Sequence, residues 1–99
     1  MEVKITTEDK VTTASLIGRL DTLAAQEIAP QMDQLKNAEG TLVLDCSELS
    51  YISSSGLRIF LTLRKAAAER GGKVIVRNIS HEIRSVFMMT GFLNLFEIQ

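Results

Sequence analysis

The aliphatic run Leu42-Val43-Leu44-Asp45-Cys46, followed by Tyr51-Ile52-Ser53-Ser54-Ser55-Gly56-Leu57-Arg58, decides the fold of this 99-residue chain. Unbroken aliphatic residues of this kind are typical of a strand that is covered on both faces. Apolar residues then recur after Gly56 at helical spacing. The sequence therefore predicts a central strand at Thr41–Cys46, a turn at Ser47–Ser50 and a long helix from Ser54 to about Arg70.

The serines at the start of this helix have two interpretations. In the simpler one they form a capped turn, because a serine hydroxyl accepts a free backbone N–H of the first helical turn. In the other, the positive end of the helix accommodates an anion, including a phosphate carried by a serine. Gly56 removes a side chain at this point, so another backbone or a partner protein could come close.

Composition limits the class of protein. Hydrophobic residues make up 45% of the chain and charged residues 23%, which is ordinary for one globular domain spanning residues 1–99. The net charge of -1 argues against a nucleic-acid partner. No apolar run reaches the ~18 residues that a membrane helix needs, and no secretory signal pattern is visible. A single cysteine fits a reducing compartment, so we expect a cytoplasmic domain without a membrane or nucleic-acid partner.

The rest of the chain alternates strands and helices. The further strands expected are Val3–Thr7, Val11–Ile17, Lys73–Arg77 and an edge strand Phe96–Ile98. One helix should have Asp21 or Thr22 as its N-cap and bury Ala25, Ile28, Met32 and Leu35. Another should run from Ser80 to Thr90, with Ser80 as its cap and Gly91 as its stop. Pro30 should bend the first of these helices or mark its true start. The order β-β-α-β-α-β-α-β predicts an α/β domain whose later strands are parallel.

Groups for enzyme chemistry are scarce. The chain has no Gly-x-Ser-x-Gly or Gly-Lys-Ser/Thr motif, and its only histidine, His81, has no neighbouring cysteine or second histidine to share a metal. Cys46 is interpreted as an inert buried thiol. Asp21, Asp45 and Glu48 are the acids nearest the strand ends, and caps or solvated turns are favoured over a magnesium or acid–base cluster. The sequence predicts no enzyme activity, no cofactor and no metal site.

Several motifs together resemble the STAS domains of anti-sigma factor antagonists. They are Gly18-Arg19-Leu20-Asp21, Leu42-Val43-Leu44-Asp45, Leu49-Ser50-Tyr51-Ile52-Ser53-Ser54-Ser55-Gly56-Leu57, Gly71-Gly72-Lys73 and Met89-Thr90-Gly91-Phe92. The most diagnostic is Ser53-Ser54-Ser55-Gly56-Leu57, which matches the family signature Asp-Ser-Ser-Gly-Leu except that Ser53 replaces the aspartate. The resemblance implies a mixed, mostly parallel sheet with three to four helices packed mainly on one side.

The resemblance also implies a partner-switching function. Unphosphorylated, the protein would bind an anti-sigma factor that is also a serine kinase, and so free the sigma factor. Phosphorylation at Ser54 would end that binding, and a PP2C-type phosphatase would reset the switch. With three adjacent serines, Ser53 or Ser55 could also accept the phosphate. Asp21 matches the acidic residue before the first helix of the family and would contact the partner beside Ser53, Ser54, Ser55, Gly56 and Leu57.

Two other functions remain open. STAS domains also serve as non-phosphorylated adaptor subunits of larger regulatory or transporter-associated assemblies. The helix start at Ser54 could instead bind a nucleotide or another anion directly.

Overall fold

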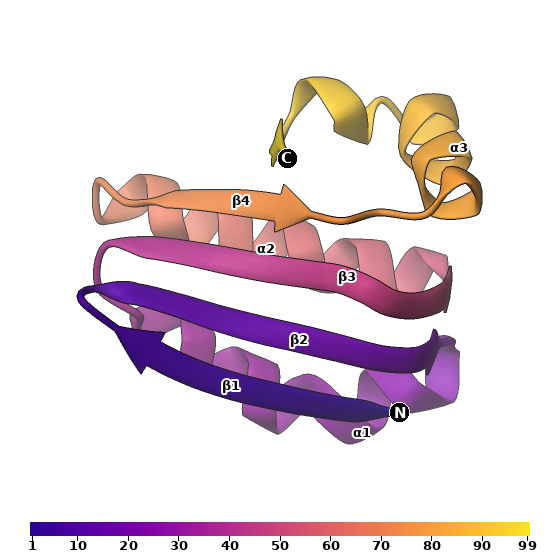
Figure 1. Ribbon diagram of the computed structural model, residues 1–99. Helices are drawn as coiled ribbons and strands as arrows, with labels where there is room; N and C mark the ends of the chain where they lie inside the picture. The colour runs from indigo at the N-terminus through magenta and orange to yellow at the C-terminus, as the bar shows by residue number, and fades with distance from the viewer.

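The computed structural model describes residues 1–99 and contains a five-stranded sheet with a layer of helices behind it (Figure 1). The strands are β1 Glu2–Glu8, β2 Val11–Leu20, β3 Thr41–Ile52, β4 Lys73–Arg77 and β5 Glu97–Ile98. The helices are α1 Thr22–Asp33, α2 Ser54–Glu69 and α3 His81–Thr90, with short 3-10 helices η1 Gln34–Asn37 and η2 Phe92–Asn94. The strands lie in the order β1-β2-β3-β4-β5; β1 and β2 are antiparallel and every other pair is parallel. The predicted mixed, mostly parallel α/β domain is confirmed.

The sheet begins with a tight hairpin. Asp9 and Lys10 connect β1 to β2, and both have positive φ, 49° and 63°. A two-residue turn of this kind matches the right-handed twist of the strands it joins. β2 is longer than the predicted strand Val11–Ile17, because it continues through Gly18, whose φ of 109° suits a residue without a side chain.

The central strand β3 also runs further than the sequence predicts. The expected turn at Ser47–Ser50 is wrong: β3 stays paired with β2 as far as Ile52. Two register shifts accommodate this polar segment in the strand. β3 carries one extra residue opposite the step from Ser15 to Ile17 of β2, and another opposite the step from Gly18 to Arg19. The Ser50 hydroxyl donates to the Gly18 carbonyl at 3.1 Å, which holds the second irregularity in place.

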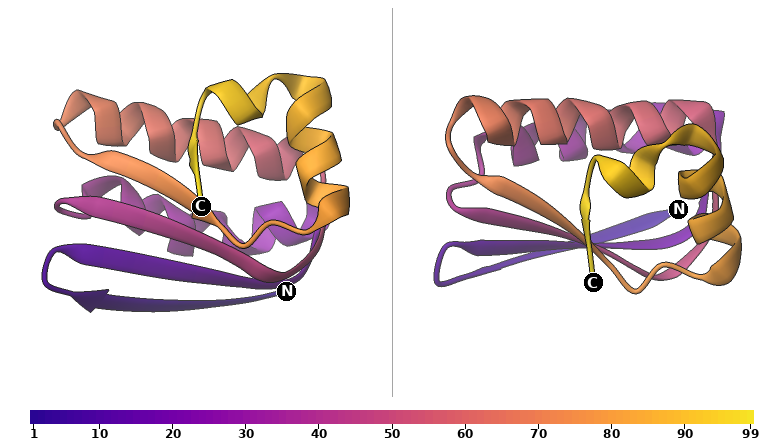
Figure 2. Two further views of the ribbon diagram at one scale, coloured as in Figure 1. Left: turned by 45° about the horizontal axis from the view of Figure 1, so that its top comes forward. Right: turned by 90° about the horizontal axis from the view of Figure 1, so that it is seen from above.

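One face of the sheet carries the helical layer. The right-hand view of Figure 2 shows α1 and α2 on the same side of the strands, as expected for helices packed mainly on one side. Leu42 and Leu44 belong to the core beneath them, whereas Val43 points to the opposite face. The aliphatic run of β3 is buried on both faces, as the sequence predicts, but α1 and α2 lie on one of them only. Val43 is nevertheless only 1% exposed, since it lies in register between Thr13 of β2 and Ile75 of β4.

The first helix follows the predicted apolar stripe. Ala25, Ile28, Met32 and, in η1, Leu35 are all buried. Pro30 lies inside α1 and does not mark its start, which is at Thr22. The last helix, α3, is capped by the Ser80 hydroxyl and ends at Gly91, with φ of 80°, as predicted.

An aromatic cluster joins the second half of the chain. The cluster consists of Phe60 of α2, Phe87 of α3, and Phe92 and Phe96 beyond it, whose rings pack edge-to-face or tilted with centroids 5.6–6.3 Å apart. These contacts attach α3 and the segment after it to α2.

Candidate functional site

The candidate site lies where β2 and β3 end. Leu20 and Ile52 are in register as the last residues of these parallel strands, and the Ser53 N–H donates to the Leu20 carbonyl at 2.8 Å. Asp21 and Ser53 follow immediately, so this pairing places them next to each other. The sheet therefore brings together two sequence-predicted residues that are 32 positions apart in the chain.

Asp21 and Ser53 cap the two helices that start here. The Asp21 Oδ1 accepts the Ala24 N–H of α1 at 2.8 Å, and the Ser53 Oγ accepts the Gly56 N–H of α2 at 3.2 Å. The starts of α1 and α2 thus lie side by side with their positive ends at one surface. Of the serines in the cluster, Ser53 is the helix cap, and its hydroxyl is already engaged.

The three serines occupy different environments. Ser53 is half-buried, Ser54 is the first residue of α2 and is exposed, and Ser55 is half-buried. Ser55 lines a groove of about 230 Å³ between α1 and α2, together with Arg58 and Lys36. Ser54 is therefore the serine of the three whose hydroxyl is most accessible to another protein.

Gly56 and Leu57 lie beneath this surface rather than on it. A methyl group at Gly56 would come within 2.7 Å of Leu20 Cγ and 2.9 Å of Ile52 Cγ1. The close approach that Gly56 permits is thus made by the ends of β2 and β3, which hold the start of α2 against the sheet. Leu57 is only 7% exposed and anchors the same turn in the core.

Three exposed residues, Arg19, Leu23 and Tyr51, surround Asp21 and Ser53, and the sequence pattern does not single them out. The Arg19 guanidinium lies over the Tyr51 ring, 4.4 Å from its centroid, on the sheet face away from the helices. Leu23, in the first turn of α1, is 65% exposed. The only sequence signal for the Arg19–Tyr51 pair is that each residue stands two positions before a helix cap, so it could be found only once the strand register is known.

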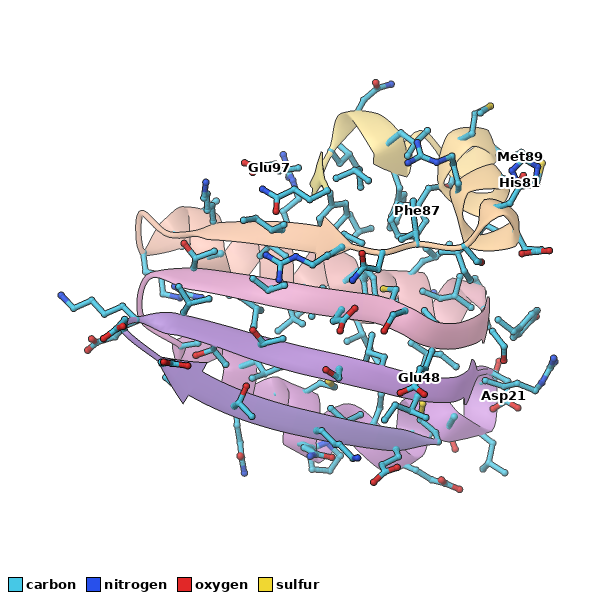
Figure 3. The ribbon with its side chains drawn as sticks, viewed as in Figure 1. Asp21, Glu48, His81, Phe87, Met89 and Glu97 are labelled. Atoms are coloured by element: carbon cyan, nitrogen blue, oxygen red, sulfur yellow. The ribbon has the colours of Figure 1, made fainter.

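The other sequence candidates have structural roles. The Asp45 Oδ1 accepts hydrogen bonds from the Ser47 N–H and the Asn78 Nδ2, both at 3.1 Å. His81 is exposed on α3, well separated from Asp21 in Figure 3. No three histidine, cysteine or acidic side chains lie close enough to hold a metal ion. Burial, with a smaller effect of the neighbouring Asp45 carboxylate, raises the pKa of the Cys46 thiol to about 12, which keeps it protonated and unreactive.

A mixed sheet with one helical layer and two adjacent helix starts defines the chain as a small α/β domain of the partly parallel, open-sheet type. The STAS domain model matches residues 2–99, and the chain belongs to the STAS domain family. None of its helices is long and apolar enough to cross a membrane.

The relatives of the chain include proteins named as anti-sigma factor antagonists. It is 31% identical over 91 residues to BtrV of Bordetella bronchiseptica, which is named as an anti-sigma factor antagonist; the match covers 91% of this chain and 78% of BtrV. It is 25% identical over 83 residues to the anti-sigma-B factor antagonist of Listeria monocytogenes, covering 83% of this chain and 73% of the relative. By homology the chain belongs with the anti-sigma factor antagonists.

Solved structures show the same fold. The unphosphorylated form of the anti-sigma factor antagonist SpoIIAA superposes with a TM-score of 0.76 at 21% identity, over 99% of this chain and 87% of that one. The phosphorylated form of SpoIIAA from Bacillus gives a TM-score of 0.76 at 22% identity, over 99% and 91%.

Proposed function

We propose that this chain is a partner-switching anti-sigma factor antagonist that is controlled by phosphorylation of Ser54. Unphosphorylated, it binds a cognate anti-sigma factor with serine kinase activity through the surface around Asp21 and Ser54, and so releases the sigma factor. The kinase transfers the γ-phosphoryl group of ATP to the Ser54 Oγ, which loses its proton, and ADP leaves. A PP2C-type phosphatase hydrolyses the phosphoserine. All of these steps belong to the cytoplasm, where the sigma factor acts.

The observation that carries this proposal is the separation of roles among the serines. Ser53 holds the helix cap, whereas Ser54 is exposed in the first turn of α2 beside the Asp21 cap of α1. A kinase can therefore modify Ser54 without breaking the cap. Ser53 and Ser55, the alternatives that the sequence leaves open, are both half-buried.

Electrostatics explain how one phosphate could switch binding without unfolding the domain. A phosphoserine adds about -1.5 to -2 charges at neutral pH. At an exposed helix start this charge is stabilised by roughly 0.3–1 kcal/mol. Inside a desolvated interface an unpaired charge costs about 3–5 kcal/mol, which weakens affinity by about two to four powers of ten. The complex therefore loses far more than the free domain gains.

Asp21 contributes a second charge to the same surface. Its Oδ1 caps α1 and leaves the other carboxylate oxygen available to a donor on the partner. Replacement by asparagine keeps an oxygen for the cap but removes the charge. Asp21→Asn therefore separates a role in binding from a role in helix stability.

The test is capture of partners from native lysate with five baits. They are wild type, Ser54→Ala, Ser54→Asp, Asp21→Asn and Thr6→Glu, which adds a negative charge on β1 near the opposite end of the sheet. We expect wild type, Ser54→Ala and Thr6→Glu to retain an ATP-binding anti-sigma factor, Ser54→Asp to lose it and Asp21→Asn to retain it more weakly. Retention of the same partners by Ser54→Asp would contradict the switch and favour an unswitched adaptor.

Direct anion binding has less support from the geometry. The N–H groups of Ala24 and Gly56, which would face an anion at the two helix starts, are taken by Asp21 and Ser53. Saturable nucleotide binding in a calorimetric titration of the isolated chain would favour that function instead.

A further inference from the structure

The exposed surface of α2 carries a line of side chains that begins at the proposed phosphorylation site. Ser54, Arg58, Leu61 and Lys65 are all exposed and follow one another at the spacing of neighbouring helical turns. We propose that Arg58 binds the phosphate of Ser54 within the same chain, so that phosphorylation withdraws the Arg58 cation from the partner-facing surface. This inference rests on the proposed modification of Ser54.

Arg58 has no ionic partner in the unmodified chain. The two ion pairs of the structure are Lys36–Asp33 and Lys73–Glu97, and none of the hydrogen bonds within the chain uses the Arg58 guanidinium. The one side-chain hydrogen bond to Arg58 is made by the Thr62 hydroxyl, which donates to the Arg58 backbone carbonyl at 3.0 Å and does not involve the guanidinium. An unpaired, exposed arginine beside the groove between α1 and α2 is available to an acidic group on a partner.

Helix geometry places the phosphate within reach of Arg58. Residues at i and i+4 have Cβ atoms about 5–6 Å apart on one face of a helix, a gap that a phosphoserine and an arginine can bridge together. The order is also the favourable one, with the acidic group nearer the helix start and the base one turn later. The planar guanidinium can donate two parallel hydrogen bonds to phosphate oxygens, which a lysine cannot.

The switch would then act in two ways. The phosphate adds negative charge, and it also forms an ion pair with Arg58, the only cationic side chain in the first two turns of α2. A partner whose acidic group contacts Arg58 would lose that contact on phosphorylation.

The experiment uses the full chain with phosphoserine installed at position 54 by genetic encoding, so no kinase is needed. Wild type, Arg58→Gln, Arg58→Lys and Lys65→Gln are each prepared with serine and with phosphoserine. Lys65→Gln is the matched control, because Lys65 lies on the same exposed face of α2 and its loss changes the net charge equally. The readouts are the ³¹P chemical shift, the arginine side-chain Nε–Hε signals and the melting temperature.

In wild type and Lys65→Gln we expect phosphoserine to shift one arginine Nε–Hε signal. That signal should be absent from the spectrum of Arg58→Gln, which assigns it to Arg58. The gain in melting temperature on phosphorylation should be smaller in Arg58→Gln than in Lys65→Gln by about 2–4 °C, with Arg58→Lys between them. Identical ³¹P shifts and identical melting gains in Arg58→Gln and Lys65→Gln would overturn the proposal. That result would leave the proposed function standing, because it concerns only where the phosphate binds. Failure to find a kinase that modifies Ser54 would count against the proposed function and would leave this test unaffected, because the phosphoserine is installed directly.

Discussion

Gly56, part of the Ser53–Leu57 signature, allows the start of α2 to pack closely against the ends of β2 and β3. It is buried, and the space that a methyl group would take is already filled by Leu20 and Ile52 at the ends of two strands. Its effect on the surface is therefore indirect: it allows the helix start to sit against the sheet with Ser54 facing outward.

We predict that Gly56→Ala destabilises the fold by about 1–2 kcal/mol. The overlap with Leu20 costs about 1–3 kcal/mol, and the better helix propensity of alanine returns up to ~1 kcal/mol. Urea denaturation followed by circular dichroism measures the difference. A Leu20→Ala background removes the overlap with Leu20 and leaves the one with Ile52, so the additional cost of Gly56→Ala should fall in that background; equal costs in both backgrounds would show that the overlap with Leu20 is not its cause.

Sequence reasoning at this scale could narrow the role of a residue but could not choose between alternatives. Gly56 indicated a close approach by an unspecified backbone or partner, and the approaching groups come from strands far away in the sequence. Ser53, Ser54 and Ser55 were equivalent as hydroxyls, and only the backbone geometry of the helix start assigns the cap to Ser53.

Among the elements, the start of α2 separates a structural hydroxyl from an exposed one. Ser53 has an extended backbone and accepts the Gly56 N–H, as a cap requires, whereas Ser54 already lies within the helix. The two serines are adjacent in sequence but should respond differently to truncation.

We predict that Ser53→Ala lowers the free energy of unfolding by about 1 kcal/mol and that Ser54→Ala changes it by less than about 0.5 kcal/mol. Thermal denaturation of the two variants, with Ser53→Asp as a substitution that keeps a capping oxygen, measures both effects. A larger loss for Ser54→Ala than for Ser53→Ala would show that Ser54 is the cap and would weaken its assignment as the phosphorylated residue.

The main difference from the sequence prediction is the length of β3, which continues to Ile52 through the segment expected to form a turn. Ser47, Glu48 and Ser50 are turn-forming or polar residues, and local propensity favours a turn there. Pairing with β2 overrides that preference, because Leu49 and Ile52 still reach the core while the polar side chains face solvent. Register shifts of this kind depend on the partner strand, which local sequence does not specify.

For the whole molecule, the order of the elements and the fold class were predictable from the residue pattern, whereas the packing of the helices on one side of the sheet was implied only by the family resemblance. Aliphatic runs, and glycines that end helices, predict strand Lys73–Arg77, helix α3 with its caps, and the parallel order of the later strands. The absence of helices behind Val43 could not be read from an unbroken aliphatic run. Val43 is buried between neighbouring strands, and burial alone produces the same pattern as a second helical layer.

At this scale the proposed switch requires the domain to hold one exposed hydroxyl, that of Ser54, in a fixed position. The Ser53 cap and the contacts of Gly56 with Leu20 and Ile52 hold the start of α2, and none of them uses the Ser54 hydroxyl. The account therefore requires the charge to change binding and leave the fold intact.

The most direct test is to incubate the chain with the kinase recovered by the Ser54→Ala bait and ATP, and to locate the phosphate by peptide mass spectrometry. The account predicts one phosphate on Ser54 in wild type, in Ser53→Ala and in Ser55→Ala, and none in Ser54→Ala. A phosphate on any other residue, or unchanged incorporation in Ser54→Ala, would contradict it.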